Sequence, residues 1–126
     1  MSSNINTEEK ITGVNLDTHL AKGLPFVREL FFTVQSRIFL LDDNIQEKVT
    51  KPYIGYKVSK MFTEVHIQKN RLLLYLRPIV YNDPENRTSK VPESHNWVLD
   101  RRIFINNVGD IDYVMSLVEQ SYKDIL

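Results

Sequence analysis

The spacing of apolar residues changes along this chain, and the change limits the folds that it can adopt. In residues 25–41 the apolar positions recur with the period of an α-helix, and Pro25 suits the first turn of a helix. Between residues 53 and 79 the period is close to two, as in β-strands, and a second helical pattern occupies residues 111–125. Successive strands between two helices predict an α+β domain with an antiparallel sheet.

We expect this sheet to contain about four to five strands. Asn tolerates left-handed backbone conformations, so Lys69-Asn70 is suited to a tight turn between strands at 62–68 and 71–79. Residues 80–94 are rich in Pro, Asn and Asp, which is typical of a loop, and the last strand is expected over 97–105. The N-terminal and C-terminal helices should pack on one face of the sheet.

The length of 126 residues supports one hydrophobic core. Residues 1–14 are rich in Ser, Asn, Thr and Glu and predict a flexible N-terminal lead-in, so the single α+β domain is expected at residues 15–126. No apolar run approaches the roughly 18 residues that a membrane span needs. Residues 1–10 also lack the apolar segment of a signal peptide. We therefore expect a cytoplasmic protein with no membrane partner.

Residue types with catalytic or metal-binding chemistry are scarce. The chain has no Cys, and its three His residues do not stand at a metal-ligand spacing. It contains neither a GxGxxG nor a GxxxxGK phosphate loop, and no GxSxG nucleophile motif. Each acidic cluster is explained as a helix end or, at Asp83-Pro84, as a turn. We therefore expect a non-catalytic domain with no cofactor and no metal site.

The charge of the chain is unevenly distributed. The total is zero, with 16 Lys and Arg residues against 16 Asp and Glu residues. Residues 48–77, however, contain seven basic residues and only Glu64 as an opposing charge, which gives this segment +6 and the remainder −6. Neutrality excludes indiscriminate coating of nucleic acid, but it permits one basic face.

Residues 71–77 place this charge on a sheet surface. Leu72, Leu74 and Leu76 should face the helices, so the alternate residues Arg71, Leu73, Tyr75 and Arg77 should lie on the open face. Basic residues interleaved with aromatic residues are typical of a surface that stacks bases and binds phosphates, so DNA, RNA or a nucleotide is the expected partner. The candidate ligand-binding residues are Lys51, Tyr53, Lys57, Lys69, Arg71, Tyr75, Arg77 and Trp97.

Other interpretations of these residues remain open. The cations can simply keep exposed strands soluble, and Trp97 can pack into the core instead of stacking a ligand ring. Leu73 and Tyr75, at the centre of the same face, can bind another protein chain or a second copy of this one. An enzymatic function would need a pocket that joins Tyr56, Glu64, His66 and Trp97.

Four short motifs, in this order, give the chain a family resemblance: residues 51–57 (KPYIGYK), 68–76 (QKNRLLLYL), 83–84 (DP) and 110–115 (DIDYVM). Together they resemble a prokaryotic domain of unknown function that has been labelled "predicted transport protein", and the likeness runs from about Val14 to Leu126. Typical members carry a glycine-containing HWGNG-like segment before the last strand. The corresponding residues 94–100 (SHNWVLD) contain no glycine.

The resemblance implies a small α+β accessory domain, and it does not supply a catalytic residue. Members of this family often stand at the C-terminus of larger proteins that carry restriction-endonuclease-like domains or resemble type IV restriction proteins. The resemblance therefore implies a role in DNA restriction or phage defence. The sequence gives no physical support for a transport function, because it contains no segment that could enter a membrane.

Overall fold

The computed structural model describes residues 15–92 and 98–126. The predicted lead-in at residues 1–14 lies outside the described residues, as do His95 and Trp97. In chain order the elements are α2 (Leu16–Leu20), α3 (Pro25–Phe39), β1 (Gln46–Val49), β2 (Ile54–Lys57), β3 (Met61–Ile67), β4 (Leu72–Leu76), β5 (Ser89–Lys90), β6 (Arg101–Ile105), the 3-10 helix η2 (Val108–Asp110) and α4 (Ile111–Lys123).

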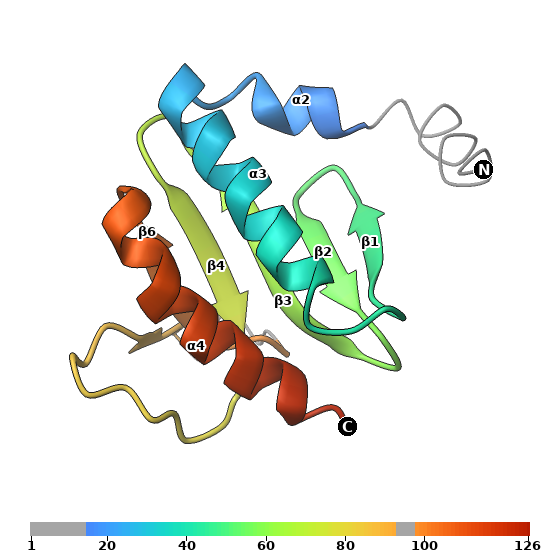
Figure 1. The fold of residues 1–126 in the computed structure, drawn as a ribbon, viewed down its shortest axis with the longest axis vertical. Helices are drawn as coiled ribbons and strands as arrows, with labels where there is room; N and C mark the ends of the chain where they lie inside the picture. Colours follow the sequence, from blue (N-terminus) through green and yellow to red (C-terminus); the bar gives the residue numbers. More distant parts are fainter. Residues whose placement is uncertain (1–14, 93–97) are drawn as a thin grey trace.

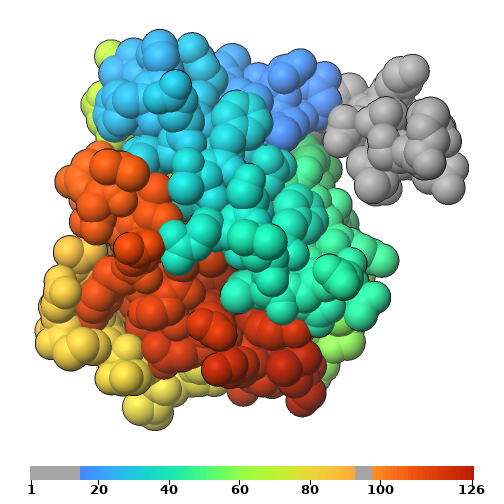
Figure 2. Space-filling view, viewed as in Figure 1, coloured from blue at the N-terminus to red at the C-terminus, as the bar shows by residue number. Residues whose placement is uncertain are grey.

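The strands form one six-stranded sheet in the order β1-β2-β3-β4-β6-β5. Every neighbouring pair is antiparallel. Helices α3 and α4 lie across one face of this sheet (Figure 1), and their side chains cover it in the space-filling view (Figure 2). The predicted α+β architecture, with both helices on one face, is confirmed. The sheet is slightly larger than expected because β1 and the two-residue β5 join its edges.

The predicted hairpin between β3 and β4 is present. Its connection is closed by a hydrogen bond from the Gln68 backbone N–H to the Arg71 carbonyl oxygen, at 3.0 Å. The Lys69 carbonyl oxygen in this turn accepts a hydrogen bond from the Leu24 N–H, also at 3.0 Å. The turn is therefore fixed to the N-terminus of α3, which begins at Pro25.

Helix α3 buries one side against the sheet, as its apolar period predicts. The buried residues of the helix are Val27, Leu30, Phe31, Val34 and Ile38. It ends at Phe39, shortly before the Asp42-Asp43-Asn44 segment. In that segment the Asp42 carboxylate accepts hydrogen bonds from the Asn44 N–H at 2.8 Å and from the Tyr122 hydroxyl at 2.5 Å. The loop after α3 is thereby joined to α4.

The main core lies between this helical layer and the sheet, with Phe31, Tyr56 and Phe62 among its largest fully buried side chains. The hydroxyl groups inside it have partners. Tyr56 donates to the Glu47 carboxylate at 2.8 Å, and Ser121 donates to the Phe62 carbonyl oxygen at 2.5 Å. Burial raises the pKa of Tyr56 strongly, and the Glu47 charge adds to the effect.

The loop between β4 and β5 is held against α4. The Asp83 carboxylate accepts hydrogen bonds from the backbone N–H groups of Arg87, at 3.0 Å, and Thr88, at 2.9 Å, and from the Tyr113 hydroxyl. The Arg87 guanidinium carbon lies 4.7 Å from the centre of the Tyr113 ring. The turn predicted at Asp83-Pro84 therefore depends on a carboxylate that organises the backbone around it.

Candidate ligand-binding face

We call the side of the sheet opposite α3 and α4 the second face. Directly opposed residues on neighbouring strands form a line across it, with one residue from each strand, and we call this line the polar row. It consists of Lys48, Gly55, Glu64, Tyr75, Arg102 and Ser89. Neighbouring strands are about 4.8 Å apart, so the row spans the whole width of the sheet.

The centre of the second face is covered. Leu73 and Tyr75 are each 7% exposed, because they pack in a small cluster with Val91 and Leu99. The expectation that residues 71, 73, 75 and 77 form an open surface is therefore wrong at its centre. The chain on either side of residues 93–97 lies over β4, which the alternation pattern in β4 cannot reveal. The dimerisation alternative loses its exposed apolar centre for the same reason.

Next to this cluster, Glu64 and His66 form a polar pair on β3. The Nε2 atom of His66 lies 3.5 Å from Oε1 of Glu64. This buried nitrogen has no hydrogen-bond partner among the described residues. The His66 ring meets the Tyr75 ring edge-on, with their centres 5.0 Å apart. Burial raises the pKa of Tyr75, and the Glu64 charge also raises it, although Arg102 acts in the opposite direction.

On β2 the second-face residue Gly55 is buried, and predicted site residues flank it. Lys51 is exposed, and Lys57 and Tyr53 are half-buried. A methyl group added to Gly55 would lie 2.6 Å from the Met61 sulfur and 3.0 Å from Cε1 of Tyr53. The Tyr53 ring and the Met61 side chain therefore lie over Gly55, which places Tyr53 beside the polar row.

Lys69 and Arg71 lie in the turn that connects β3 to β4. The Arg71 guanidinium carbon lies 3.8 Å from the centre of the Phe104 ring, and its Nε atom donates to Oε1 of Gln68 at 2.8 Å. Lys69 is exposed in the turn. None of the predicted lysines, at positions 51, 57 and 69, forms an ion pair with a carboxylate in the described ranges. Their charges are available to a ligand.

Two predicted site residues are placed differently. Arg77 lies beyond the end of β4, so strand alternation no longer directs it to the second face. Its Nε atom donates to the Asp124 carboxylate at 2.7 Å, and its Nη1 atom donates to the Met61 carbonyl oxygen at 3.2 Å. Arg77 therefore joins the sheet to the end of α4. Trp97 lies outside the described residues, and Tyr56 of the enzymatic alternative faces the main core.

Sequence reasoning missed Lys48 and Arg102. The segment Gln46–Val49 contains a single apolar residue, so its strand β1 gives no hydrophobic alternation. Arg102 lies in a strand that was expected, and pairing with β4 would have placed it opposite Tyr75. The signal for Lys48 was present in the charge distribution, because it begins the segment of +6.

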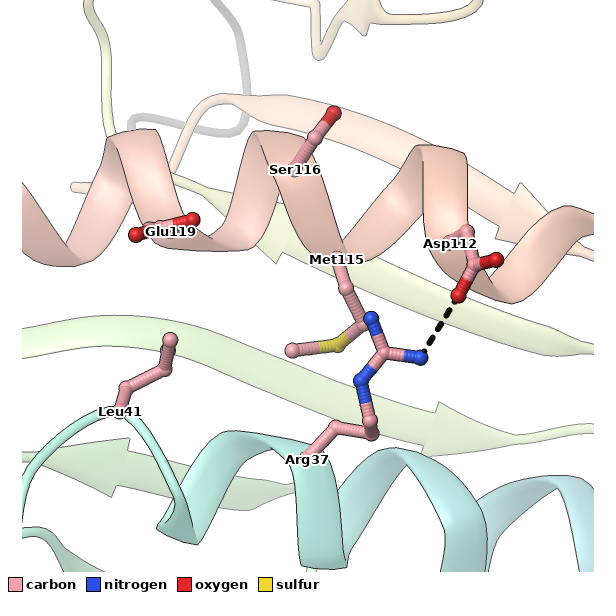
Figure 3. A pocket seen from close by; sticks show the side chains of 6 residues that line it. All are labelled: Arg37, Leu41, Asp112, Met115, Ser116 and Glu119. Atoms are coloured by element: carbon pink, nitrogen blue, oxygen red, sulfur yellow. Dashed lines mark hydrogen bonds and ion pairs between the residues drawn. The ribbon is translucent and has the colours of Figure 1, made fainter.

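The helical side of the molecule also has a groove (Figure 3). It has a volume of about 180 Å³ between α3 and α4, where Arg37 donates to Asp112 at 2.8 Å beside the Met115 side chain. This exposed ion pair joins the two helices. Because Arg37 and Asp112 pair with each other, the groove offers no cluster of unpaired polar groups that would bind a ligand together. Within residues 15–92 and 98–126, no group of three or more His, Asp or Glu residues is placed to hold a metal ion. No helix in these ranges is long and apolar enough to cross a membrane.

The fold and this face define a small α+β domain with helices on one side of its sheet and, on the other, basic side chains around a small apolar cluster. The chain belongs to the family described as "Domain of unknown function (DUF5655)", whose model matches residues 16–125. It is 30% identical, over 110 residues, to an uncharacterized protein of Haemophilus influenzae. The match covers 84% of this chain but 36% of that relative, so the chain spans little more than a third of the relative's length. No solved structure matches the chain.

Proposed function

We propose that this domain is a non-catalytic binding module that recognises nucleic acid or a nucleotide through its second face. The observation that carries the proposal is the charge of this face. Lys48, Lys57, Arg71 and Arg102 lie on it, whereas strands β2, β3 and β4 contribute one carboxylate, that of Glu64. Cations without a carboxylate partner are available to neutralise phosphates.

The aromatic residues support the same proposal. Tyr53 lies over Gly55 beside the polar row, and Phe104 carries the stacked Arg71 guanidinium. Bases of single-stranded nucleic acid stack on aromatic rings and on guanidinium planes, while lysines follow the phosphates. Helices do not cover this face, and its exposed part over β1 and β2, beside the cluster at Leu73 and Tyr75, is where a single strand can bind.

Salt-dependent binding tests the proposal. Fluorescent single-stranded DNA and RNA should bind at low salt, and the affinity should fall as salt is added because counterions are released from phosphates. The double variant Lys48→Ala/Lys57→Ala should weaken binding by roughly tenfold and reduce the slope of log affinity against log salt by about 1.4, at about 0.7 for each phosphate contact with a single strand. The matched control, Lys22→Ala/Lys123→Ala, removes the same charge near α2 and in α4 and should bind like the unchanged protein. Absence of binding at low salt would overturn the proposal.

The competing candidate is a protein-interaction or dimerisation module. Leu73 and Tyr75 at the centre of the second face are buried, so such a module would need another surface. Sedimentation at high protein concentration separates the two candidates, because a monomer that binds nucleic acid counts against dimerisation.

The cellular setting belongs to the same proposal. A cytoplasmic role in DNA restriction or phage defence is supported by the family resemblance carried by residues 51–57 and 68–76. Such a system acts on DNA, which agrees with a basic binding face. Genes for nucleases or nucleotide hydrolases beside the genes of close relatives would be the expected finding, and neighbours without any such genes would count against it.

A further inference from the structure

Glu64 is the feature of the second face that phosphate binding does not explain. A negative charge in the polar row repels phosphate, and yet the carboxylate lies at its middle, opposite Gly55 and Tyr75. Its side chain is 23% exposed. No described N–H or O–H group donates a hydrogen bond to it, since His66 Nε2 is 3.5 Å away and is itself without a hydrogen-bond partner.

Among the described residues Glu64 therefore has only the 3.5 Å contact with His66, and its partly exposed oxygens are left to water, whereas the His66 nitrogen is buried. A partly buried carboxylate loses free energy when it has no donor, and an imidazole nitrogen shielded from water does so as well. A ligand that brings N–H groups to Glu64 would replace this water with the donors that the carboxylate lacks among the described residues. A nucleic acid donates hydrogen bonds through the N–H groups of its base edges and through the ribose 2′-hydroxyl. Of these, a base edge is the group that can offer two adjacent donors to the two oxygens of one carboxylate.

The geometry of a carboxylate selects among the bases. Guanine presents two adjacent donors, N1–H and the N2 amino group, which match the two oxygens of one carboxylate. Adenine presents its N6 amino group next to N1, which is a hydrogen-bond acceptor. N1 and the second carboxylate oxygen would then be two acceptors facing each other, and they would repel. Cytosine presents the N4 amino group next to an acceptor in the same way. Guanine is therefore the base that satisfies both oxygens of Glu64.

A stacking surface lies at the right place for this base. Gly55 is directly opposite Glu64, and the Tyr53 ring lies within contact distance of Gly55. A base stacked on Tyr53 over β2 would therefore have its edge near the Glu64 carboxylate. Lys48, on the other side of Gly55 in the polar row, is exposed and placed to meet the phosphate of the same nucleotide.

We propose that Glu64 reads the donor edge of a guanine base that stacks on Tyr53, so that the second face prefers guanine-containing single strands. This inference rests on the proposed function, because it requires that nucleic acid binds to this face. Its chemistry is shared by guanine within a strand and by a free guanine nucleotide, and competition between them identifies the source.

The test compares short, unstructured RNA oligomers in which uridine alternates with guanosine, inosine or adenosine. Inosine keeps N1–H but lacks the 2-amino group. The full chain should bind the guanosine oligomer roughly tenfold more tightly than the adenosine oligomer, with inosine between them. Glu64→Gln should remove this preference and should leave binding of the adenosine oligomer unchanged or stronger, because it removes a repulsive charge. Glu119→Gln, on the exposed side of α4, is the matched control.

The outcomes separate this inference from the proposed function. If no oligomer binds at low salt, the proposed function itself fails. If all oligomers bind equally, and Glu64→Gln strengthens binding of each to the same degree, the domain binds phosphates and guanine reading is wrong. Competition by GMP at concentrations that leave AMP without effect supports a mononucleotide ligand, whereas competition only by the guanosine oligomer supports a strand. Circular dichroism of each variant verifies that the fold is retained.

Discussion

The two faces of the sheet satisfy their polar groups in opposite ways. On the helix-covered face the buried hydroxyls of Tyr56, Thr63 and Ser121 each have a protein acceptor, at 2.8, 2.9 and 2.5 Å respectively. On the second face the Nε2 atom of His66 has no hydrogen-bond partner in the described part of the chain, and Lys57 forms no ion pair there. One face uses its polar groups for stability, and the other keeps them available.

This difference follows from access to water. A polar group enclosed between two layers loses its hydration, so it must bond to protein or cost the fold stability. A group on the exposed part of the second face, such as the Lys57 ammonium, keeps some hydration and can exchange it for a ligand. Changes on the helix-covered face should therefore affect mainly the free energy of unfolding, and changes on the second face should affect mainly binding.

The largest effect is expected from adjacent leucines in β4. Leu74 is 0% exposed in the main core, and Leu73 is 7% exposed in the four-residue cluster on the second face. Leu74→Ala should lower the free energy of unfolding by about 4 kcal/mol, because it leaves a cavity in a dense core. Leu73→Ala should cost about 2 kcal/mol, since fewer atoms surround it. Urea unfolding measures both, and equal losses would show that the second face is packed as firmly as the core.

A smaller effect is expected where α4 meets the sheet. The Ser121 hydroxyl donates to the Phe62 carbonyl oxygen at 2.5 Å and accepts from the Arg77 N–H at 3.0 Å. Ser121→Ala leaves both backbone groups without a partner and should cost about 2 kcal/mol of unfolding free energy. Ser116→Ala, on the exposed side of the same helix, should change it by less than about 0.5 kcal/mol. Similar values for the two variants would contradict the contrast between the faces.

Much of the fold follows from residues that the sequence displays. The apolar stripe of α3, with Pro25 at its start, and the Lys69-Asn70 turn are local patterns, and the structure has them where they were expected. The edge strands β1 and β5 were missed because they have little apolar content: Gln46–Val49 is half exposed, and Ser89–Lys90 is exposed throughout. Such strands form because a neighbouring strand offers free backbone groups, which is a non-local cause.

The candidate site was harder to predict, because it depends on register and on chain crossings. Alternation correctly placed Tyr75 on the face away from the helices, but it could not show that Val91 and Leu99 cover it. It also assigned Arg77 to that face, although Asp124 draws this side chain to the end of α4. The pairing of Glu64 with Gly55 and Tyr75 depends on the sheet register, which no local pattern fixes.

The smallest effect on stability is expected in the loop between β4 and β5, where Asp83 holds the backbone of the loop and contacts α4. Burial acts against the Asp83 charge, but hydrogen bonds from Tyr113, Thr88 and Arg87 outweigh it and lower the pKa of Asp83 from 3.8 to about 2. Because the pKa is lower in the folded state, this carboxylate stabilises the fold above about pH 4, and the contribution is lost as the pH falls toward 2. Asp83→Asn should therefore reduce the loss of stability in acid, as measured by thermal unfolding at a series of pH values.

Tyr113→Phe sharpens this prediction, because it removes one donor to Asp83 and keeps the aromatic ring that Arg87 covers. The pKa of Asp83 should rise toward 3.8, so the loss of stability should begin at a higher pH than in the unchanged protein. Binding at neutral pH should stay the same in both variants, since neither Asp83 nor Tyr113 belongs to the polar row. A variant that unfolds normally in acid but binds nucleic acid weakly would instead show that this loop contributes to the second face.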